Sequence, residues 1–369
     1  KTLLKPLHRS AEFCSTCHKT HIPESVNHYR WLRAQNHYDS FLQSGVSGHR
    51  VDSFYYPRQA VPRCSTCHMP LQASDDPAAR DFNNSGKRHV HSHQFPAANT
   101  GVAHMVGLPE SVIEAHRKRL TGVTRIDIFG IKEGGHINGE LQAPLRPKLP
   151  ALVPGEKYLV EIVVRTTGVG HHLTQGTSDS NQLWLDVTAT AGDRLIGRSG
   201  ARDDTGSVDP WSYFLNSYVL DRDGNRIDRR NGQDIFVPLY NHQIPPGAAT
   251  VVHYLLEVPA DTREPVVIEA SLNYRKFDTT YMQHMRGDDF TVNDLPITTM
   301  ASDRIELPVG RGQDDMSFDL HPVAENERWN DYGIGLLRQG DSGSNKGELR
   351  QAEQAFRQVE VLGDMDGAM

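Results

Sequence analysis

The pentapeptide Cys14-Ser15-Thr16-Cys17-His18 occurs a second time in this chain, as Cys64-Ser65-Thr66-Cys67-His68. The two copies contain all four cysteines of the 369-residue sequence. Histidine is concentrated in the same part of the chain, because 12 of the 19 histidines lie in residues 1–120. The organisation of the N-terminal third therefore depends on these two stretches, and we work outward from them.

The Cys-x-x-Cys-His pattern is typical of the covalent attachment of c-type haem. Two thiols add to the two vinyl groups on one porphyrin edge, and the adjoining histidine ligates the iron from below. The four cysteines have three alternative roles: two structural disulfides, one zinc site formed by all four, or a redox-active pair. Zinc ribbons place their cysteine pairs about 15–20 residues apart, whereas 46 residues separate Cys17 from Cys64, and a redox pair needs one copy in a βαβ unit. We therefore expect two covalent haems c, each with its iron, attached through Cys14, Cys17, Cys64 and Cys67 and ligated by His18 and His68.

Cellular location and partner classes follow from the same motif and from the charge. Haem c is attached outside the cytoplasm, so we expect a periplasmic or cell-surface protein whose export signal is absent from a chain that starts at Lys1. The 39 basic and 46 acidic residues give a formal charge of −7, which argues against nucleic acid as a partner. Mean hydropathy is −0.54. The sequence contains no apolar run of about 18 residues, so we expect no transmembrane segment.

Each iron of an electron carrier normally has a sixth, distal ligand, usually His or Met. His37 is the first candidate. It follows Trp31 in a stretch where Tyr29, Leu32, Tyr38 and Phe41 have helical spacing, so we expect a helix that lays an aromatic ring and His37 against a porphyrin.

His93 is the second distal candidate. His89, His91 and His93 alternate along an extended segment, which places all three on one face, and His93 adjoins Phe95 and Pro96. Met69 follows proximal His68 directly and is expected only to pack. For any single histidine the alternative is a surface or hydrogen-bonded side chain. Weaker candidates are His91, His21, His28 and His49, followed by His104, Met105 and His8.

The segment 1–120 resembles the multihaem c-type cytochromes of the cytochrome c554-like family. The resemblance lies in CSTCHKTH, HYRWLRAQNHYDSF, CSTCHMP and HSHQFPAANT. It departs once from the family's Trp-x-x-Ser-x-His pattern, because Trp31 and His37 are one residue further apart and Gln replaces Ser. Residues 168–187 resemble the β-sandwich modules that accompany such cytochromes. The resemblance implies a higher haem count than two and a haem-bearing segment before Lys1.

A change of character from about residue 122 predicts a second architecture. β-Branched and aromatic runs are separated by Gly and Pro, without a helical period of useful length, which favours an antiparallel β-sandwich over 121–312. The runs are 125–129, 158–165, 183–188, 213–220, 251–258 and 266–274. His171 and His172 follow a Gly-rich turn, where they ligate a metal, face a haem or stabilise the turn. Asp221–Asp228 lacks the spacing of a calcium loop and is expected to form a hairpin turn.

The C-terminal residues are expected to form helices. Trp329, Tyr332, Gly333 and Leu336 match the first helix of a tetratricopeptide repeat, and Ala352 and Phe356 match the second after an insertion. One repeat cannot bury its own face. We therefore expect that the tail docks on the sandwich or that more repeats follow Met369.

These patterns predict a multidomain α+β protein. A mostly helical or loop-rich dihaem domain (1–120) precedes the antiparallel β-sandwich (121–312) and a linker with the start of a tetratricopeptide-like helical tail (313–369). We expect an electron carrier rather than an enzyme, with two bis-His haems that exchange electrons with other haem-bearing chains or segments in an oligomer or complex. The alternatives are an oxidoreductase for a nitrogen or sulfur oxyanion, with an open haem near Lys87, Arg88 and His91, and a scaffolding subunit with structural haems.

Overall fold

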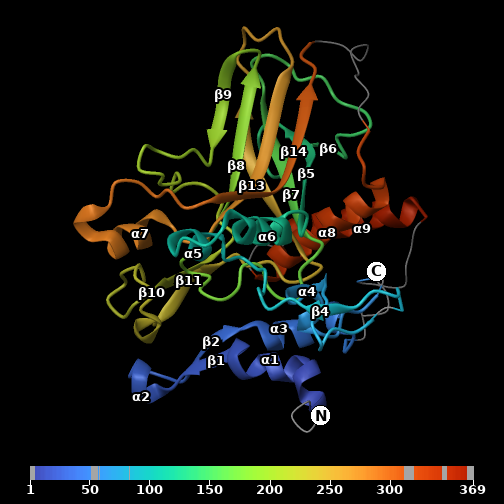
Figure 1. The fold of residues 1–369 in the computed structure, drawn as a ribbon. Helices are drawn as coiled ribbons and strands as arrows, with labels where there is room; N and C mark the ends of the chain where they lie inside the picture. Colours follow the sequence, from blue (N-terminus) through green and yellow to red (C-terminus); the bar gives the residue numbers. More distant parts are fainter. Residues whose placement is uncertain are drawn as a thin grey trace.

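The computed structural model describes residues 5–50, 57, 59–82, 84–310, 320–342 and 347–363. It contains helices and several antiparallel sheets, so the expected mixed α+β architecture is confirmed at that level. Figure 1 shows the N-terminal elements below two upright sheets and the C-terminal helices beside them. The boundaries at 120/121 and 312/313 stay predictions.

The N-terminal segment consists of short helices and two small hairpins. The pentapeptides lie in α1 and α4, and the hairpins pair β1 with β2 and β3 with β4. The elements are α1 (Ala11–His18), β1 (Lys19–Ile22), α2 (Glu24–Asn27), β2 (Leu32–Asn36), α3 (His37–Leu42), α4 (Cys64–His68), β3 (Leu71–Ala73), β4 (His89–His91), α5 (Thr100–Met105) and α6 (Glu110–Leu120).

The helix expected to carry His37 begins later than its aromatic spacing predicts. Residues 32–36 form β2, which pairs antiparallel with β1, and α3 starts only at His37. The Asn36 side chain explains the boundary, because it accepts a hydrogen bond from the backbone N–H of Asp39 and so caps α3. The prediction of a helix through Leu32 was wrong, since strand pairing and this cap outweigh the helical spacing.

Two four-stranded antiparallel sheets pack against each other in the centre of the chain. One has the order β12-β7-β5-β6 and the other β14-β13-β8-β9. The strands are β5 (Thr124–Glu133), β6 (Leu141–Gln142), β7 (Lys157–Thr166), β8 (Gln182–Ala191), β9 (Arg194–Ser199), β12 (Ala249–Glu257), β13 (Val266–Arg275) and β14 (Ile297–Leu307). Five of the six expected runs lie largely within these strands.

The sixth run, 213–220, is a strand only in its second half. β10 (Ser217–Leu220) pairs with β11 (Val237–Asn241) outside the two main sheets. A helix, α7 (Thr279–Arg286), also interrupts the sheet region. Its start is fixed by the Asp278 side chain, which accepts a hydrogen bond from the N–H of Tyr281. The sequence analysis did not predict this helix, which follows the last of the six runs, because a single capped helix of this length leaves little periodic signal.

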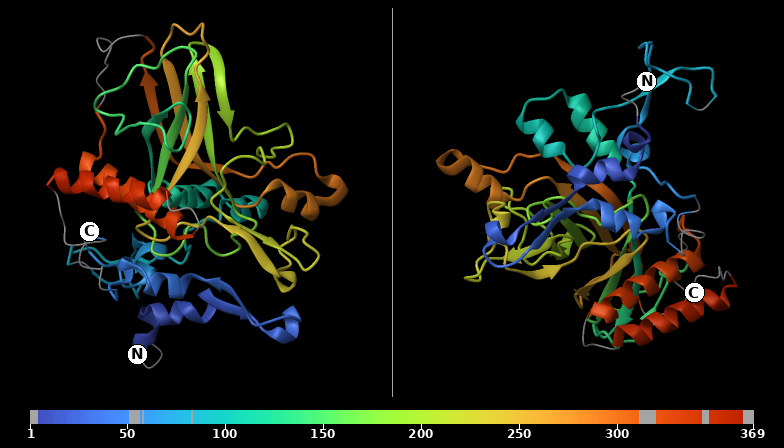
Figure 2. Two further views of the ribbon diagram at one scale, coloured as in Figure 1. Left: turned by 180° about the vertical axis from the view of Figure 1, so that it is seen from behind. Right: turned by 90° about the horizontal axis from the view of Figure 1, so that it is seen from below.

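Both faces of the β12-β7-β5 sheet are buried, and the period of a strand explains how. Successive side chains point to opposite faces, so Ile128 and Ile162 enter the core between the sheets, whereas their neighbours Phe129 and Val163 face the other way. That outer face is covered by α8 (Glu325–Ser342) and α9 (Gly347–Val361). The two helices lie side by side against the sheet (Figure 2).

The contact between tail and sheet is a packed core. The Tyr332 ring stacks on Phe129 with centroids 4.5 Å apart, and Leu336 is fully buried. Gly335 lies so close to the sheet that a Cβ atom there would come within 2.8 Å of the Val251 side chain. The tail therefore docks on the β-sheet, which was one of the two outcomes expected for a single helical pair.

A buried ion pair lies beneath the docked helices. The fully buried carboxylate of Glu161 is 2.5 Å from Lys132 Nζ and 3.2 Å from His253 Nε2. Burial by itself would raise the pKa of Glu161, but the hydrogen bond from His253 and the charge of Lys132 outweigh burial and lower it from 4.5.

We expect this carboxylate to make acid unfolding steeper. Below pH 4.5 the unfolded chain binds a proton at residue 161 before the folded chain does, so the free energy of unfolding falls by up to about 1.4 kcal/mol per pH unit until the folded pKa is passed. The Glu161→Gln variant should lack this part of the slope in urea titrations between pH 3 and 7. Equal slopes for both proteins would contradict the prediction.

Candidate haem-binding site

The two pentapeptides occupy the ends of two neighbouring helices. α1 ends at His18 and α4 ends at His68. Within each helix the two cysteines are three residues apart, so they share one face. The structure pairs none of the four cysteines in a disulfide. Burial, and next the adjacent Cys14 thiol, raise the pKa of Cys64 to about 12, so the first cysteines of the two motifs lie side by side.

One cavity of about 480 Å³ connects both motifs. This volume lies within the range of pockets that enclose organic ligands, about 300–1,000 Å³. The cavity is formed by segments far apart in the sequence, including α1, α3, α4, the start of β5, the loop after β7 and the end of β13. Apolar side chains make up much of the lining: Phe41, Val46, Val61, Leu120, Val123, Val169, Leu173 and Tyr274.

Five histidines line this cavity, His172 among them, and the rings of the other four lie close together. The ring centroids of His18 and His37 are 5.2 Å apart, and those of His37 and His171 are 4.7 Å apart, with nearly perpendicular planes in both pairs. The rings of His68 and His171 are nearly parallel, with centroids 6.2 Å apart. The cavity thus brings both motif histidines together with His37, which the sequence singled out, and with His171 from the β-sheet region.

The cavity keeps His37, His68 and His171 neutral. Burial first, and then the neighbouring His171 and His18, lower the pKa of His37 to about 3. Burial also lowers the pKa of His171 to about 4 and lowers that of His68, even though backbone hydrogen bonds act in the opposite direction. Neutral imidazole is the form that binds a metal, so these three side chains are ready to ligate at neutral pH.

Hydrogen bonds at Nδ1 fix which ring nitrogen is free. His68 Nδ1 lies 3.1 Å from the backbone oxygen of Pro96, and His171 Nδ1 lies 3.1 Å from the backbone oxygen of His172. A carbonyl only accepts, so each Nδ1 donates its proton and each Nε2 keeps a free lone pair. Both rings therefore present Nε2 as a ligand atom.

The Gln35 amide connects the other two rings. Its terminal nitrogen lies 3.1 Å from His18 Nδ1 and 3.3 Å from His37 Nδ1. Ligation through Nε2 requires a proton on Nδ1 and hence an acceptor opposite it. A half-turn of the amide presents its oxygen to both rings and supplies that acceptor.

Cationic side chains surround the same cavity, namely Arg63, Arg119, Arg230 and Lys276. Burial lowers the pKa of Lys276 to about 8, and the nearby Arg230 acts in the same direction. A cation whose charge is disfavoured in this way is stabilised by an anionic partner. The two propionates of a haem are such partners, so the chemistry of the lining fits a porphyrin with its carboxylates.

His93 does not lie with these residues. Its side chain is exposed, its Nδ1 lies 3.0 Å from the backbone oxygen of His91, and it is not among the described residues that line the cavity. The neighbouring His91 is half-buried, with its Nδ1 2.8 Å from the backbone oxygen of Met69. Proximity in sequence to Phe95, which does line the cavity, therefore did not bring the His93 side chain into it.

The remaining candidates also lie outside the cavity lining. His21 stacks on Trp31, and the His8 ring contacts Phe13. His28, His104 and Met105 are exposed. Met69 lines the cavity next to His68, as expected of a packing residue.

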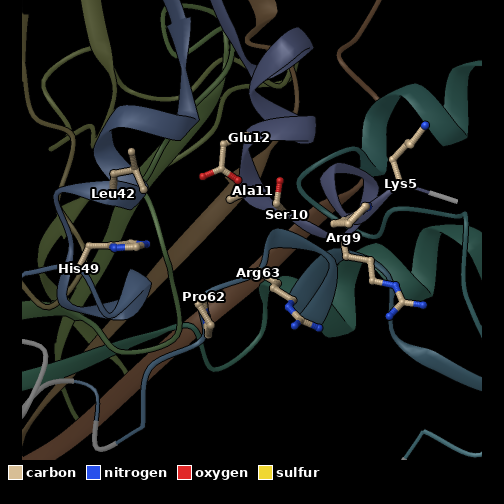
Figure 3. Close-up of a pocket in the computed structure, with 10 residues that line it drawn as sticks. Lys5, Arg9, Ser10, Ala11, Glu12, Leu42, His49, Pro62 and Arg63 are labelled. Carbon is tan, nitrogen blue, oxygen red and sulfur yellow. The ribbon is translucent and has the colours of Figure 1, made fainter.

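His49 lines a second cavity, of about 610 Å³, on the other side of α1. Figure 3 shows Lys5, Arg9 and Arg63 around it, together with Glu12 of α1. It shares Ala11 and Arg63 with the first cavity. The basic side chains of this second cavity would suit the carboxylates of a haem attached at α1. The histidine rings that lie close together are in the first cavity.

One other group of potential metal ligands exists among the described residues, formed by Asp127, Asp303 and His321. Each carboxylate is already paired with a guanidinium. Arg328 donates to both oxygens of Asp127 at 2.7 and 2.9 Å, and Arg146 donates to both oxygens of Asp303 at 2.8 and 2.5 Å. These charges neutralise one another, so this group is a structural ion network between β5, β14 and α8.

Sequence reasoning missed several residues of the site. Gln35 was noted only as a departure from a family pattern, and Arg119, Arg230 and Lys276 were not considered. No local signal marks the three cations, because they come from distant elements that only the fold brings to one cavity. The Gly-rich turn before His171 did mark this residue in the sequence, but it did not decide between ligation and stabilisation of the turn.

Comparison with known proteins gives limited similarity. No protein-family profile matches the sequence, and no curated protein matches it significantly. Among solved structures, a penta-heme cytochrome c552 from Thermochromatium tepidum is similar at 14% identity and a TM-score of 0.48, over 82% of this chain and 57% of the other. The sporulation control protein Spo0M from Bacillus subtilis is similar at 12% identity and a TM-score of 0.20, over 59% of this chain and 56% of the other.

The chain spans less than two thirds of either of these structures. At such identities and TM-scores neither similarity defines the function. Among the helices described, none combines the length and the apolar character needed to cross a membrane.

Proposed function

We propose that this chain is an extracytoplasmic multihaem c-type cytochrome that passes single electrons through two covalently bound, bis-His haems. The observation that supports this proposal most directly is the convergence of both Cys-x-x-Cys-His motifs on one cavity that contains two further neutral imidazoles. When bound there, haem supplies one-electron redox chemistry. The chain supplies the thiols that hold it, the axial nitrogens and an apolar enclosure.

The chain's own residues favour electron transfer between the two sites. Cys14 and Cys64 are in contact, so the two attachment edges are adjacent. Irons held on both sides by these imidazoles, within a largely apolar lining, would undergo little reorganisation with each electron. We propose an electron carrier rather than an enzyme, within a redox assembly of other haem-bearing partners.

The enzymatic alternative finds little support among these residues. Lys87 and Arg88 were its motivation, yet both are exposed and neither is among the described residues that line the cavity. Arg88 lies 3.7 Å from the carboxylate of Asp75, which is typical of a solvated turn.

Spectroscopy of the purified holoprotein tests the proposal. We expect a mass that includes two covalent haems, low-spin spectra in both oxidation states, and two one-electron waves in a potentiometric titration. High-spin ferric haem with rapid cyanide binding at both irons would exclude a closed carrier. Free thiols by mass would exclude a c-type cytochrome altogether.

Gln35 is expected to tune one of the two potentials. In Gln35→Glu a carboxylate accepts more strongly from the Nδ1 protons of His18 and His37, which stabilises ferric iron and lowers the potential. Gln35→Leu removes the acceptor and should raise it. A tenfold change in the preference of the ligands for the ferric state corresponds to about 59 mV for one electron. Redox titration followed at the haem bands measures the shift.

The control is Gln43→Glu, which adds the same charge at an exposed position after α3. It should leave both potentials nearly unchanged. If it lowers the potential as much as Gln35→Glu does, the effect comes from the added charge in general and not from the hydrogen bonds.

A further inference from the structure

The loop after β7 carries a histidine from the β-sheet region into the cavity between the two motifs. His171 lies in this loop, which joins β7 to β8. The backbone N–H groups of Thr167 and Gly168 both donate to the Val123 oxygen, at 3.0 and 3.1 Å. Leu173 exchanges two backbone hydrogen bonds with Ile244, at 2.9 and 2.7 Å. The loop is thus fixed to the sheets on both sides of His171.

The same loop is held against the N-terminal segment. The Ser44 hydroxyl donates to the Gly170 oxygen at 3.3 Å. A Cβ atom at Gly170 would be in ordinary van der Waals contact with the Phe41 ring, at 3.4 Å, and with the Val46 side chain, at 3.5 Å. These contacts place His171 between the two parts of the molecule.

The separation of the His171 and His68 rings is close to the one that a shared iron would need. A metal–imidazole bond is about 2.0 Å long and the ring centre lies about 1 Å behind the nitrogen, so two axial imidazoles have centres about 6 Å apart. The centroids of His68 and His171 are 6.2 Å apart. Both rings also direct Nδ1 to a backbone oxygen, which leaves both Nε2 atoms available.

The other histidines fit this position less well. His37 lies next to His18, and both are within reach of the Gln35 amide, which groups these two around the first motif. His172 also lines the cavity, but the ring that lies 6.2 Å from His68 is that of His171. His93 is exposed.

We propose that His171 is the sixth ligand of the haem iron that His68 holds. This inference rests on the proposed function, because it concerns the second haem. It replaces the expectation that His93 is the sixth ligand of this iron. His37 would then be the sixth ligand of the iron that His18 holds. The second iron would then be held by two distant segments, α4 and the β7–β8 loop, and would tie the sheets to the N-terminal segment.

Substitution of His171 in the holoprotein tests this assignment. Mass spectrometry first establishes that His171→Ala still carries two covalent haems, and far-UV circular dichroism establishes that it folds. We then expect one of the two haems to become high-spin and, once reduced, to bind carbon monoxide, while the other stays low-spin. Added imidazole should restore the low-spin spectrum by entering the space that the side chain leaves.

Two matched variants separate His171 from its neighbours. His172→Ala keeps the backbone oxygen that accepts from His171 Nδ1, so both haems should stay low-spin. His93→Ala should also leave both haems low-spin. The assignment is overturned if His171→Ala stays low-spin and refuses carbon monoxide, or if His93→Ala gives the high-spin haem instead.

The thermal stability of the sheets gives a second readout. If His171 binds the iron, addition of carbon monoxide to the reduced wild type should not alter its melting temperature, whereas His171→Ala should melt lower than His172→Ala. Equal melting temperatures for the two variants would contradict a bond between the loop and the iron. Failure of the proposed function is distinguishable, because it appears in the wild type as missing haem mass or high-spin irons.

Discussion

The double variant Cys64→Ala/Cys67→Ala is expected to lose one haem completely and to retain the other. In the proposed attachment, both thioethers to this haem would come from these two thiols, and α4 offers no other nucleophile of that kind in the five residues Cys64–His68. Without covalent attachment, haem would have to be held by ligation alone. We therefore expect the holoprotein mass to fall by one haem and the alpha-band absorbance per chain to fall to about half, since each motif would carry one cofactor.

Ser65→Ala is the matched control, because it changes the same helix and leaves both thiols in place. Its haem mass should equal that of the wild type. The corresponding variant at Cys14 and Cys17 should lose the other haem. A double variant with unchanged haem mass would show that these cysteines do not attach the cofactor, and the assignment of the whole cavity would fail with it.

The Asp127→Asn variant is expected to lose about 3–5 kcal/mol of stability, the usual cost of removing one partner of a buried ion pair. The Asp127 carboxylate receives two hydrogen bonds from Arg328 and lies 3.3 Å from Arg146 Nη2. Arg328 is 2% exposed, so its charge would be left without a carboxylate in a dry environment. Urea denaturation followed by circular dichroism measures the loss.

The structure also predicts where this loss appears. Arg328 belongs to α8, whose contact with the sheet includes this pair, so hydrogen exchange should accelerate first in α8 and α9. Asp261→Asn is the control. Asp261 pairs with Arg194 at the surface, where solvent screens the charges, and its denaturation midpoint should not change. Equal effects of the two substitutions would contradict a structural role for the Asp127 network.

The sequence predicted the elements whose signals are local. Runs of β-branched and aromatic residues between Gly and Pro marked the strands at 158–165 and 266–274, which the structure places in β7 and β13. Local signals gave the wrong element where pairing with another strand competed with the local preference. The aromatic spacing around Leu32 suggested a helix, yet pairing with β1 turned these residues into β2.

The predictions of site residues also succeeded where the signal was local and failed where it was not. The motif spacing alone singled out the four cysteines and the two proximal histidines. It could not rank the distal histidines, because each was judged by its own neighbours. The residue that lies 6.2 Å from His68 is His171, more than a hundred positions further along the chain, and nothing near either residue encodes that contact.

For this protein the sequence by itself determined where each thiol pair and its adjoining imidazole lie in α1 and α4, since covalent order along a helix sets their spacing. It also determined most strands of the two sheets and the apolar face of the tail. Only the tertiary structure decided which imidazoles meet, which cations surround them and where the tail docks. These depend on loops and sheets packed against one another, and the free energy of that packing is a property of the whole chain rather than of any short stretch.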